Sequence, residues 1–184
     1  MSRMTRLTLA LALSALGLAG CGGGGGDGDK QLALGQEAVV EYTTAASGDT
    51  AAVNTTLGVT VLAIRKGTQA ELKQAGFEVD PENRSATPYY VDVRYANKGN
   101  GKASRDNSVA MEDSDGNSIP TTLVFDYRGK PYDKCENVRG GLAPGQSYED
   151  CTLFLVPKDE DVGNILFTSQ SADAAIKFTR WEPE

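Results

Sequence analysis

Short apolar runs separated by turn-forming residues recur along residues 57–181, and this spacing limits the fold more than any other feature. In the run 89–96, the apolar set Tyr89, Val91, Val93 and Tyr95 alternates with Tyr90, Asp92 and Arg94, which is typical of a strand that turns one face to a core. Segments rich in Gly, Asn and Asp, such as 97–101 and 113–117, predict turns. About seven to eight short strands with almost no helix predict an all-β fold, an antiparallel β-sandwich, with a closed barrel as the alternative.

One short helix interrupts the strands at residues 68–75. Thr68 is a suitable N-cap, Glu71 follows three residues later, and Gly76 ends the segment. The segment 80–83 predicts a turn. Further strands are predicted at residues 57–64, 109–112, 118–125, 148–156, 165–168 and 176–181.

The first twenty residues have the pattern of an export signal. Arg3 and Arg6 precede an apolar stretch at 7–18, and no acidic residue occurs before Asp27. About a dozen apolar residues suit a secretory signal, whereas a spanning helix needs roughly 20. An uncleaved membrane anchor is the alternative.

The end of this segment, Leu18-Ala19-Gly20-Cys21, resembles the lipobox of bacterial lipoproteins. The resemblance implies that residues 1–20 are a lipoprotein signal peptide, that the Cys21 sulfur receives a diacylglyceryl group, and that cleavage precedes Cys21. Two acyl chains hold a protein stably on a bilayer. The expected location is therefore the extracytoplasmic face of the cell membrane, and the alternative is ordinary secretion with a chance cysteine.

Five consecutive glycines follow at residues 22–26. Glycine has the largest backbone freedom to lose, so we predict a flexible tether over residues 21–54, with a short strand at 38–42. The predicted domain then covers residues 55–184.

Two cysteines, Cys135 and Cys151, remain once Cys21 is assigned to lipid. Two cysteines in an exported chain predict a disulfide, here around a glycine-rich loop of about fifteen residues. Closing such a loop stabilises by roughly 3 kcal/mol. Free thiols or a cysteine metal pair are the alternatives.

Several short motifs occur in a characteristic order, in the runs 57–61, 65–67, 87–97, 115–117, 142–145 and 154–157. This order resembles the Ig-like (telokin-like) domain of actinobacterial lipoproteins, which is related to the secreted immunogenic antigens of mycobacteria. The resemblance covers roughly residues 55–181 and implies an Ig-like sandwich without assigned catalytic residues.

Composition excludes several kinds of chemistry. The chain contains no histidine, which removes His-based triads, Cys–His dyads and imidazole metal ligands. It has no glycine-rich phosphate loop between a strand and a helix. A net charge of −7 without a basic cluster argues against nucleic acid. We therefore expect no cofactor, no resident metal and no catalytic residue.

Two groups of residues remain as weak candidates for binding. The acidic turns 112–115 and 159–161 leave a surface calcium site open, although Ser118 and Val124 break the EF-hand pattern. Tyr127 and Tyr132, in a polar segment, are candidate exposed binding aromatics.

The sequence thus favours a non-enzymatic, lipid-anchored surface module that binds a protein, peptide or cell-wall ligand. The alternatives are a carboxylate-dependent hydrolase of envelope material and a structural envelope lipoprotein without a specific ligand.

Overall fold

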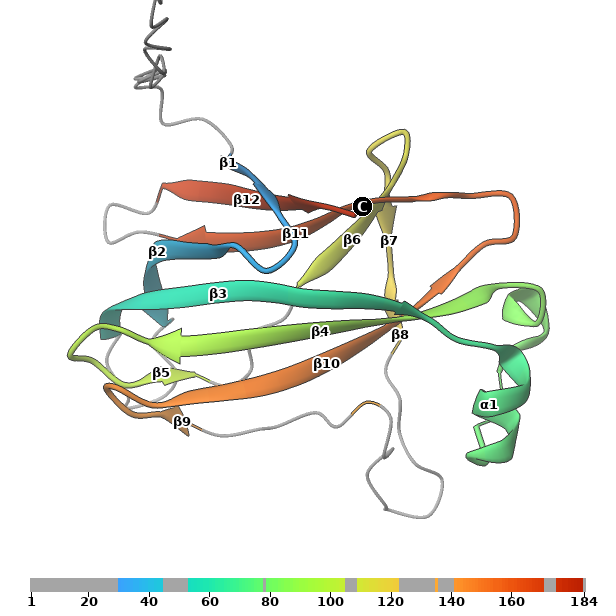
Figure 1. The fold of residues 1–184 in the computed structure, drawn as a ribbon, viewed down its shortest axis with the longest axis horizontal. Helices are drawn as coiled ribbons and strands as arrows, with labels where there is room; N and C mark the ends of the chain where they lie inside the picture. Colours follow the sequence, from blue (N-terminus) through green and yellow to red (C-terminus); the bar gives the residue numbers. More distant parts are fainter. Residues whose placement is uncertain are drawn as a thin grey trace, which may run out of the picture.

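The computed structural model describes residues 30–44, 53–77, 79–104, 109–122, 135, 141–170 and 175–183. These residues form two five-stranded sheets that pack face to face (Figure 1). The predicted all-β sandwich is confirmed, and within the described residues eight strands have four residues or more. The two sheets share no strand pairing in this part of the chain, so the barrel alternative was wrong.

Sheet A contains, in spatial order, β1 (Lys30–Ala33), β12 (Ile176–Glu182), β11 (Val162–Gln170), β6 (Ala110–Asp113) and β7 (Ser118–Ile119). Sheet B contains β2 (Glu37–Thr44), β3 (Val53–Lys66), β4 (Thr87–Asn97), β10 (Ser147–Val156) and β8 (Thr121–Thr122). A separate short pair joins β5 (Ala103–Ser104) to β9 (Gly141–Leu142). The main pairs are antiparallel, and β1 pairs with β12 in parallel.

The sandwich begins earlier than the predicted boundary at residue 55. Strand β1 places Lys30 opposite Thr179, and β2 pairs along its whole length with β3. The predicted short strand at 38–42 lies inside β2. The predicted tether 21–54 is therefore wrong where it includes these strands, because both strands are held by partners that local composition does not reveal. Residues 21–29 lie outside the described part of the chain.

The main core lies between the sheets. Tyr95 on β4 stacks on Tyr148 on β10 with ring centroids 5.2 Å apart, and Phe167 on β11 lies 6.1 Å from Tyr95. The pKa of the Tyr95 hydroxyl is raised well above its usual range, mainly because the side chain is buried. The hydroxyl therefore stays neutral in the core. Trp181 on β12 is completely buried, and its Nε1 donates to the Gln36 carbonyl at 2.9 Å. Aromatic side chains thus join the two sheets.

A buried asparagine fixes the loops at one end of sheet B. Asn97 is 1% exposed, and its Nδ2 donates to the carbonyls of Gly101 at 2.7 Å and Leu142 at 2.8 Å. Its Oδ1 accepts from Thr55 Oγ1 at 2.9 Å and from the Gly99 N–H at 3.1 Å. All the hydrogen-bonding groups of this amide are satisfied, as burial requires.

At the opposite end, next to Tyr90 and Leu155, sheet B is buried on both faces. The alternation predicted for residues 89–96 places Tyr89, Val91, Val93 and Tyr95 toward the core, and the last three are fully buried. Tyr90 points to the opposite face and is nevertheless only 2% exposed. A second apolar cluster covers it, and this cluster supports the candidate site.

Candidate functional site

The site is built around helix α1 (Gln69–Gln74), which follows β3. Thr68 Oγ1 accepts from the Glu71 N–H at 3.2 Å, and Glu71 Oε2 accepts from the Thr68 N–H at 2.9 Å. This is the predicted capping box. Gly76 adopts φ 88°, a conformation that favours glycine, and ends the helix so that the chain turns back toward the sheet.

The second cluster seats α1 on the outer face of sheet B. Leu72, the buried residue of the helix, is 1% exposed, and Phe77 and Val79 pack on the cluster from the segment that follows. Its buried members are Leu72, Ala86, Tyr90, Cys135, Cys151, Leu153 and Leu155. The helix therefore rests on an apolar layer of its own, separate from the main core between the sheets.

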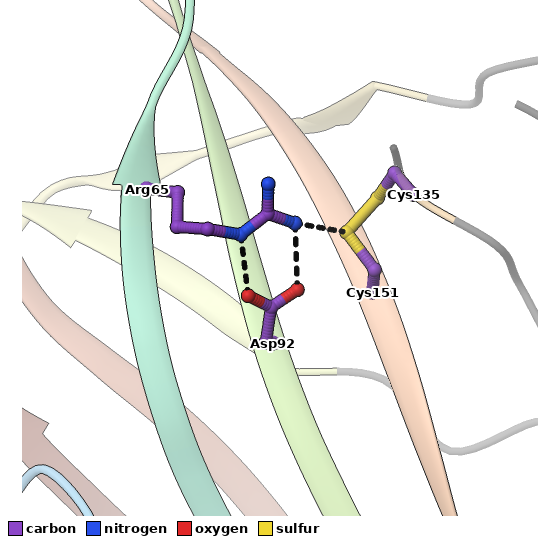
Figure 2. The surroundings of a disulfide bond; sticks show 4 residues. All are labelled: Arg65, Asp92, Cys135 and Cys151. Carbon is purple, nitrogen blue, oxygen red and sulfur yellow. Dashed lines mark hydrogen bonds and ion pairs between the residues drawn. A yellow bond between two sulfur atoms is a disulfide. The ribbon is translucent and has the colours of Figure 1, made fainter. Parts of the chain in front are cut away.

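A disulfide between Cys135 and Cys151 belongs to this cluster, as the sequence predicts. Beside it, Arg65 makes a bidentate ion pair with Asp92, with N···O distances of 2.5 and 2.8 Å (Figure 2). The Arg65 Nη2 atom also lies 3.9 Å from Cys151 Sγ, and the guanidinium lies 5.2 Å from the centre of the Tyr90 ring. Arg65 thereby covers the border of the cluster, where β3, β4 and β10 run side by side.

A groove of about 610 Å³ lies between α1 and the segment that returns to β4. Its volume is in the range of small-ligand sites. Gln69 on α1 links the two sides of the groove, since its Nε2 donates to the carbonyls of Asn83 at 3.1 Å and Ala86 at 2.6 Å. The lining residues are Gln69, Lys73, Phe77, Val79, Asp80, Pro81 and Arg84.

The groove combines an apolar surface with two cations. Phe77 and Val79 line it while they also contact the second cluster, so the apolar wall is anchored in the fold. Lys73 and Arg84 are exposed, and neither makes an ion pair with a carboxylate of the described residues. Asp80 is the one carboxylate among the described lining residues. This arrangement suits a ligand that presents an anionic group beside an apolar group.

The described lining of this groove lacks the pair of carboxylates that catalysis by paired acids requires. Carboxylate glycosidases need two acids about 5–10 Å apart across the scissile bond. The described lining provides one carboxylate, Asp80, together with the basic side chains of Lys73 and Arg84. The groove is therefore equipped to bind by charge and apolar contact.

The acidic turns are occupied by internal contacts or exposed to solvent. Asp113 Oδ1 accepts from the N–H groups of Asp115 at 2.9 Å and Asn117 at 2.8 Å, and its Oδ2 accepts from Asn117 Nδ2 at 2.8 Å. The Asn117 side chain, and then these backbone donors, lower the pKa of the Asp113 carboxyl. Residues 159–161 are exposed. The described part of the chain holds no cluster of three potential metal ligands.

Other predicted site residues lie outside the described residues, namely Cys21, Tyr127 and Tyr132. The structure therefore leaves the lipidation and aromatic-surface predictions as they stand. In the described part of the chain, no helix has both the length and the apolarity needed to cross a bilayer.

Comparison with known proteins supports the fold. No protein-family model matches the chain, and no curated protein matches it. The secreted protein MPT63 of Mycobacterium tuberculosis has a similar structure, with a TM-score of 0.55 and 11% identity over 84% of this chain and 98% of that one. An uncharacterized β-sandwich protein of Clostridium difficile 630 has a TM-score of 0.42 and 11% identity over 83% and 93% of the respective chains. At this identity the likeness to MPT63 concerns the fold alone.

Sequence reasoning missed the groove residues. Lys73 lies in the predicted helix, and Pro81 lies in the predicted turn, but nothing local brings these two segments together. A usable signal in the sequence was the pair of basic residues Lys73 and Arg84, which flanks the apolar Phe77 and Val79 in a chain with a net negative charge.

Proposed function

We propose that this chain is a non-enzymatic binding module, anchored by lipid on Cys21 at the extracytoplasmic face of a bacterial membrane. The observation that carries the binding proposal is the groove, in which Lys73 and Arg84 are unpaired with described carboxylates beside an apolar wall. The lipobox-like Leu18-Ala19-Gly20-Cys21 supports the anchor. The secreted nature of the structurally similar mycobacterial protein agrees with an exported location.

The ligand that this groove suits is a carboxylate-bearing peptide, either free or as part of a cell-wall fragment. Its carboxylate would lie between the two cations, and its apolar side chains would contact Phe77, Val79 and Pro81. Each surface cation contributes little alone, about 0.2–1 kcal/mol, and a desolvated apolar contact adds to it. We therefore expect modest affinity for any single short ligand.

The test measures binding of defined probes to the soluble chain carrying Cys21→Ser. One probe is a fluorescent decapeptide of alternating Glu and Leu, a second is its Gln and Leu counterpart, and a third is a set of soluble muropeptides. We expect the acidic probe to bind more tightly than the amide counterpart. Comparison of the first and third probes then identifies whether a free peptide or a cell-wall fragment is preferred.

Two variants locate the interaction. Lys73→Ala and Arg84→Ala should each weaken binding of the acidic probe about 1.4-fold to fivefold, which corresponds to about 0.2–1 kcal/mol. Lys102→Ala is the matched control, because Lys102 is exposed but lies next to β5 and Gly141, away from the groove. Equal effects of all three substitutions would show that only net charge matters and would contradict a groove site.

A further inference from the structure

The outer face of sheet A has one polar end and one apolar end. At the polar end, Arg180 pairs with Glu112 at 3.2 Å, and Gln31 Nε2 donates to Asn164 at 3.1 Å and to Glu182 at 2.7 Å. The other end exposes apolar side chains.

That apolar end is formed by the start of β12. Ile176 is 62% exposed and Phe178 is 37% exposed, the highest exposures of large apolar residues on sheet A among those described. Across the ladder, Gln170 pairs with Ile176 and Thr168 pairs with Phe178, and both partners are exposed and uncharged. We call these four residues the β12 patch.

The chain enters the sandwich beside this patch. Because β1 runs parallel to β12 with Lys30 opposite Thr179, the N-terminal end of β1 lies toward the end of β12 that carries Phe178 and Ile176. Only nine peptide links separate Cys21 from Lys30. Even fully extended, nine links reach at most about 32 Å, so a lipid on Cys21 would keep the patch close to the bilayer.

Charge is also favourable at this end. The described segments 165–170 and 175–181 contain no acidic residue, although the whole chain carries a net charge of −7, and Asp173 lies in the connection between them, outside the described residues. Lys30 and Lys177 are exposed beside the patch. An anionic bilayer surface is therefore less repelled here than elsewhere on this acidic protein.

We propose that the β12 patch is a membrane-contacting surface that rests on the headgroup region of the bilayer and orients the sandwich. This inference depends on the proposed lipid anchor at Cys21. Two apolar side chains would bind a bilayer weakly on their own. A short linker raises the effective concentration to about the millimolar range, so weak contact is sufficient once the lipid is inserted.

The orientation has a consequence for the groove. Figure 1 shows α1 at the opposite end of the sandwich from the start of β12. A protein that rests on the β12 patch therefore turns the groove away from the bilayer, toward ligands of the envelope.

The test uses the full chain, made in a bacterium that matures lipoproteins and reconstituted in phosphatidylglycerol and phosphatidylethanolamine vesicles with brominated acyl chains. Phe178→Trp adds an indole at the patch, and Gln170→Trp is a second reporter across the ladder in case the first variant folds poorly. Gln74→Trp on α1 is the matched control. The native Trp181 is buried and supplies a constant background.

We expect a blue shift and a loss of the added emission for the two patch reporters, and neither change for Gln74→Trp. Equal quenching of patch and control reporters, in a sample whose Cys21 is acylated by mass spectrometry, would overturn the membrane surface and leave the anchor intact. An unmodified Cys21 would overturn the anchor and this inference together, without affecting the groove. A blue shift that grows with protein concentration without vesicles would instead assign the patch to contact between two copies.

Discussion

The disulfide should stabilise the second cluster by an amount that its loop length sets. Cys135 and Cys151 are 16 residues apart, and cross-linking a loop of this size lowers the entropy of the unfolded chain by an amount equivalent to about 3 kcal/mol at 25 °C. We therefore predict that Cys135→Ala with Cys151→Ala lowers the free energy of unfolding by about 3 kcal/mol. For a domain of about 150 residues this corresponds to a fall in Tm of about 6–12 °C.

The loss should begin in the second cluster. Both cysteines are members of the second cluster, which supports α1, whereas Trp181 belongs to the main core between the sheets. In the double variant we expect the amides of α1 to exchange hydrogen faster, while the fluorescence of Trp181 stays native until global unfolding. The groove should also bind the acidic probe more weakly.

The assay compares urea unfolding of the double variant with a reference chain, both carrying Cys21→Ser to remove the third thiol. Trp181 fluorescence follows the main core, and hydrogen exchange of Leu72 follows the helix. Chemical reduction of the reference chain should reproduce the effect of the two substitutions. A loss below about 1 kcal/mol would refute the loop-closure estimate, because constraint of the unfolded chain would then not be the main contribution.

Three further changes test separate parts of the structure. Asn97→Ala should destabilise by about 2–4 kcal/mol, since it removes the amide that donates to the Leu142 and Gly101 carbonyls and accepts from Thr55 and Gly99, and urea unfolding measures this. Thr68→Ala should cost about 1 kcal/mol through loss of the helix cap, with faster exchange of α1 amides. Folding lowers the pKa of Asp113, so its stabilisation is complete above the ordinary pKa and is lost as the pH falls through the lowered value. Unfolding measured from pH 6 to 2 should show a smaller acid-induced loss for Asp113→Asn.

Local signals were sufficient for the elements that carry their own pattern. The capping box of Thr68 and Glu71 predicted α1, period-two alternation predicted β4, and the flanking residues Pro144, Gly145 and Pro157 bounded the strand predicted at β10. These signals act over a few residues, so the sequence displays them directly.

Contacts between residues far apart in the chain could not be predicted from the sequence. Strand β1 has four residues, starts with Lys30 and Gln31, and pairs with a segment almost 150 residues away. Tyr90 was assigned to the polar side of its strand because nothing nearby indicates that α1 and Cys135 cover it. The groove depends on the same packing, which explains why its lining was missed.

Mapping of backbone amide shifts tests the central claim, that the groove beside α1 is the ligand site, most directly. The acidic decapeptide would be titrated into the isotope-labelled soluble chain, and each amide resonance followed to saturation. We predict that the largest shifts fall on Gln69, Lys73, Phe77 and Arg84, and that a Lys73→Ala, Arg84→Ala chain needs a higher peptide concentration to reach half of its shift. Shifts confined to strands remote from α1, or none at saturating peptide, would contradict it.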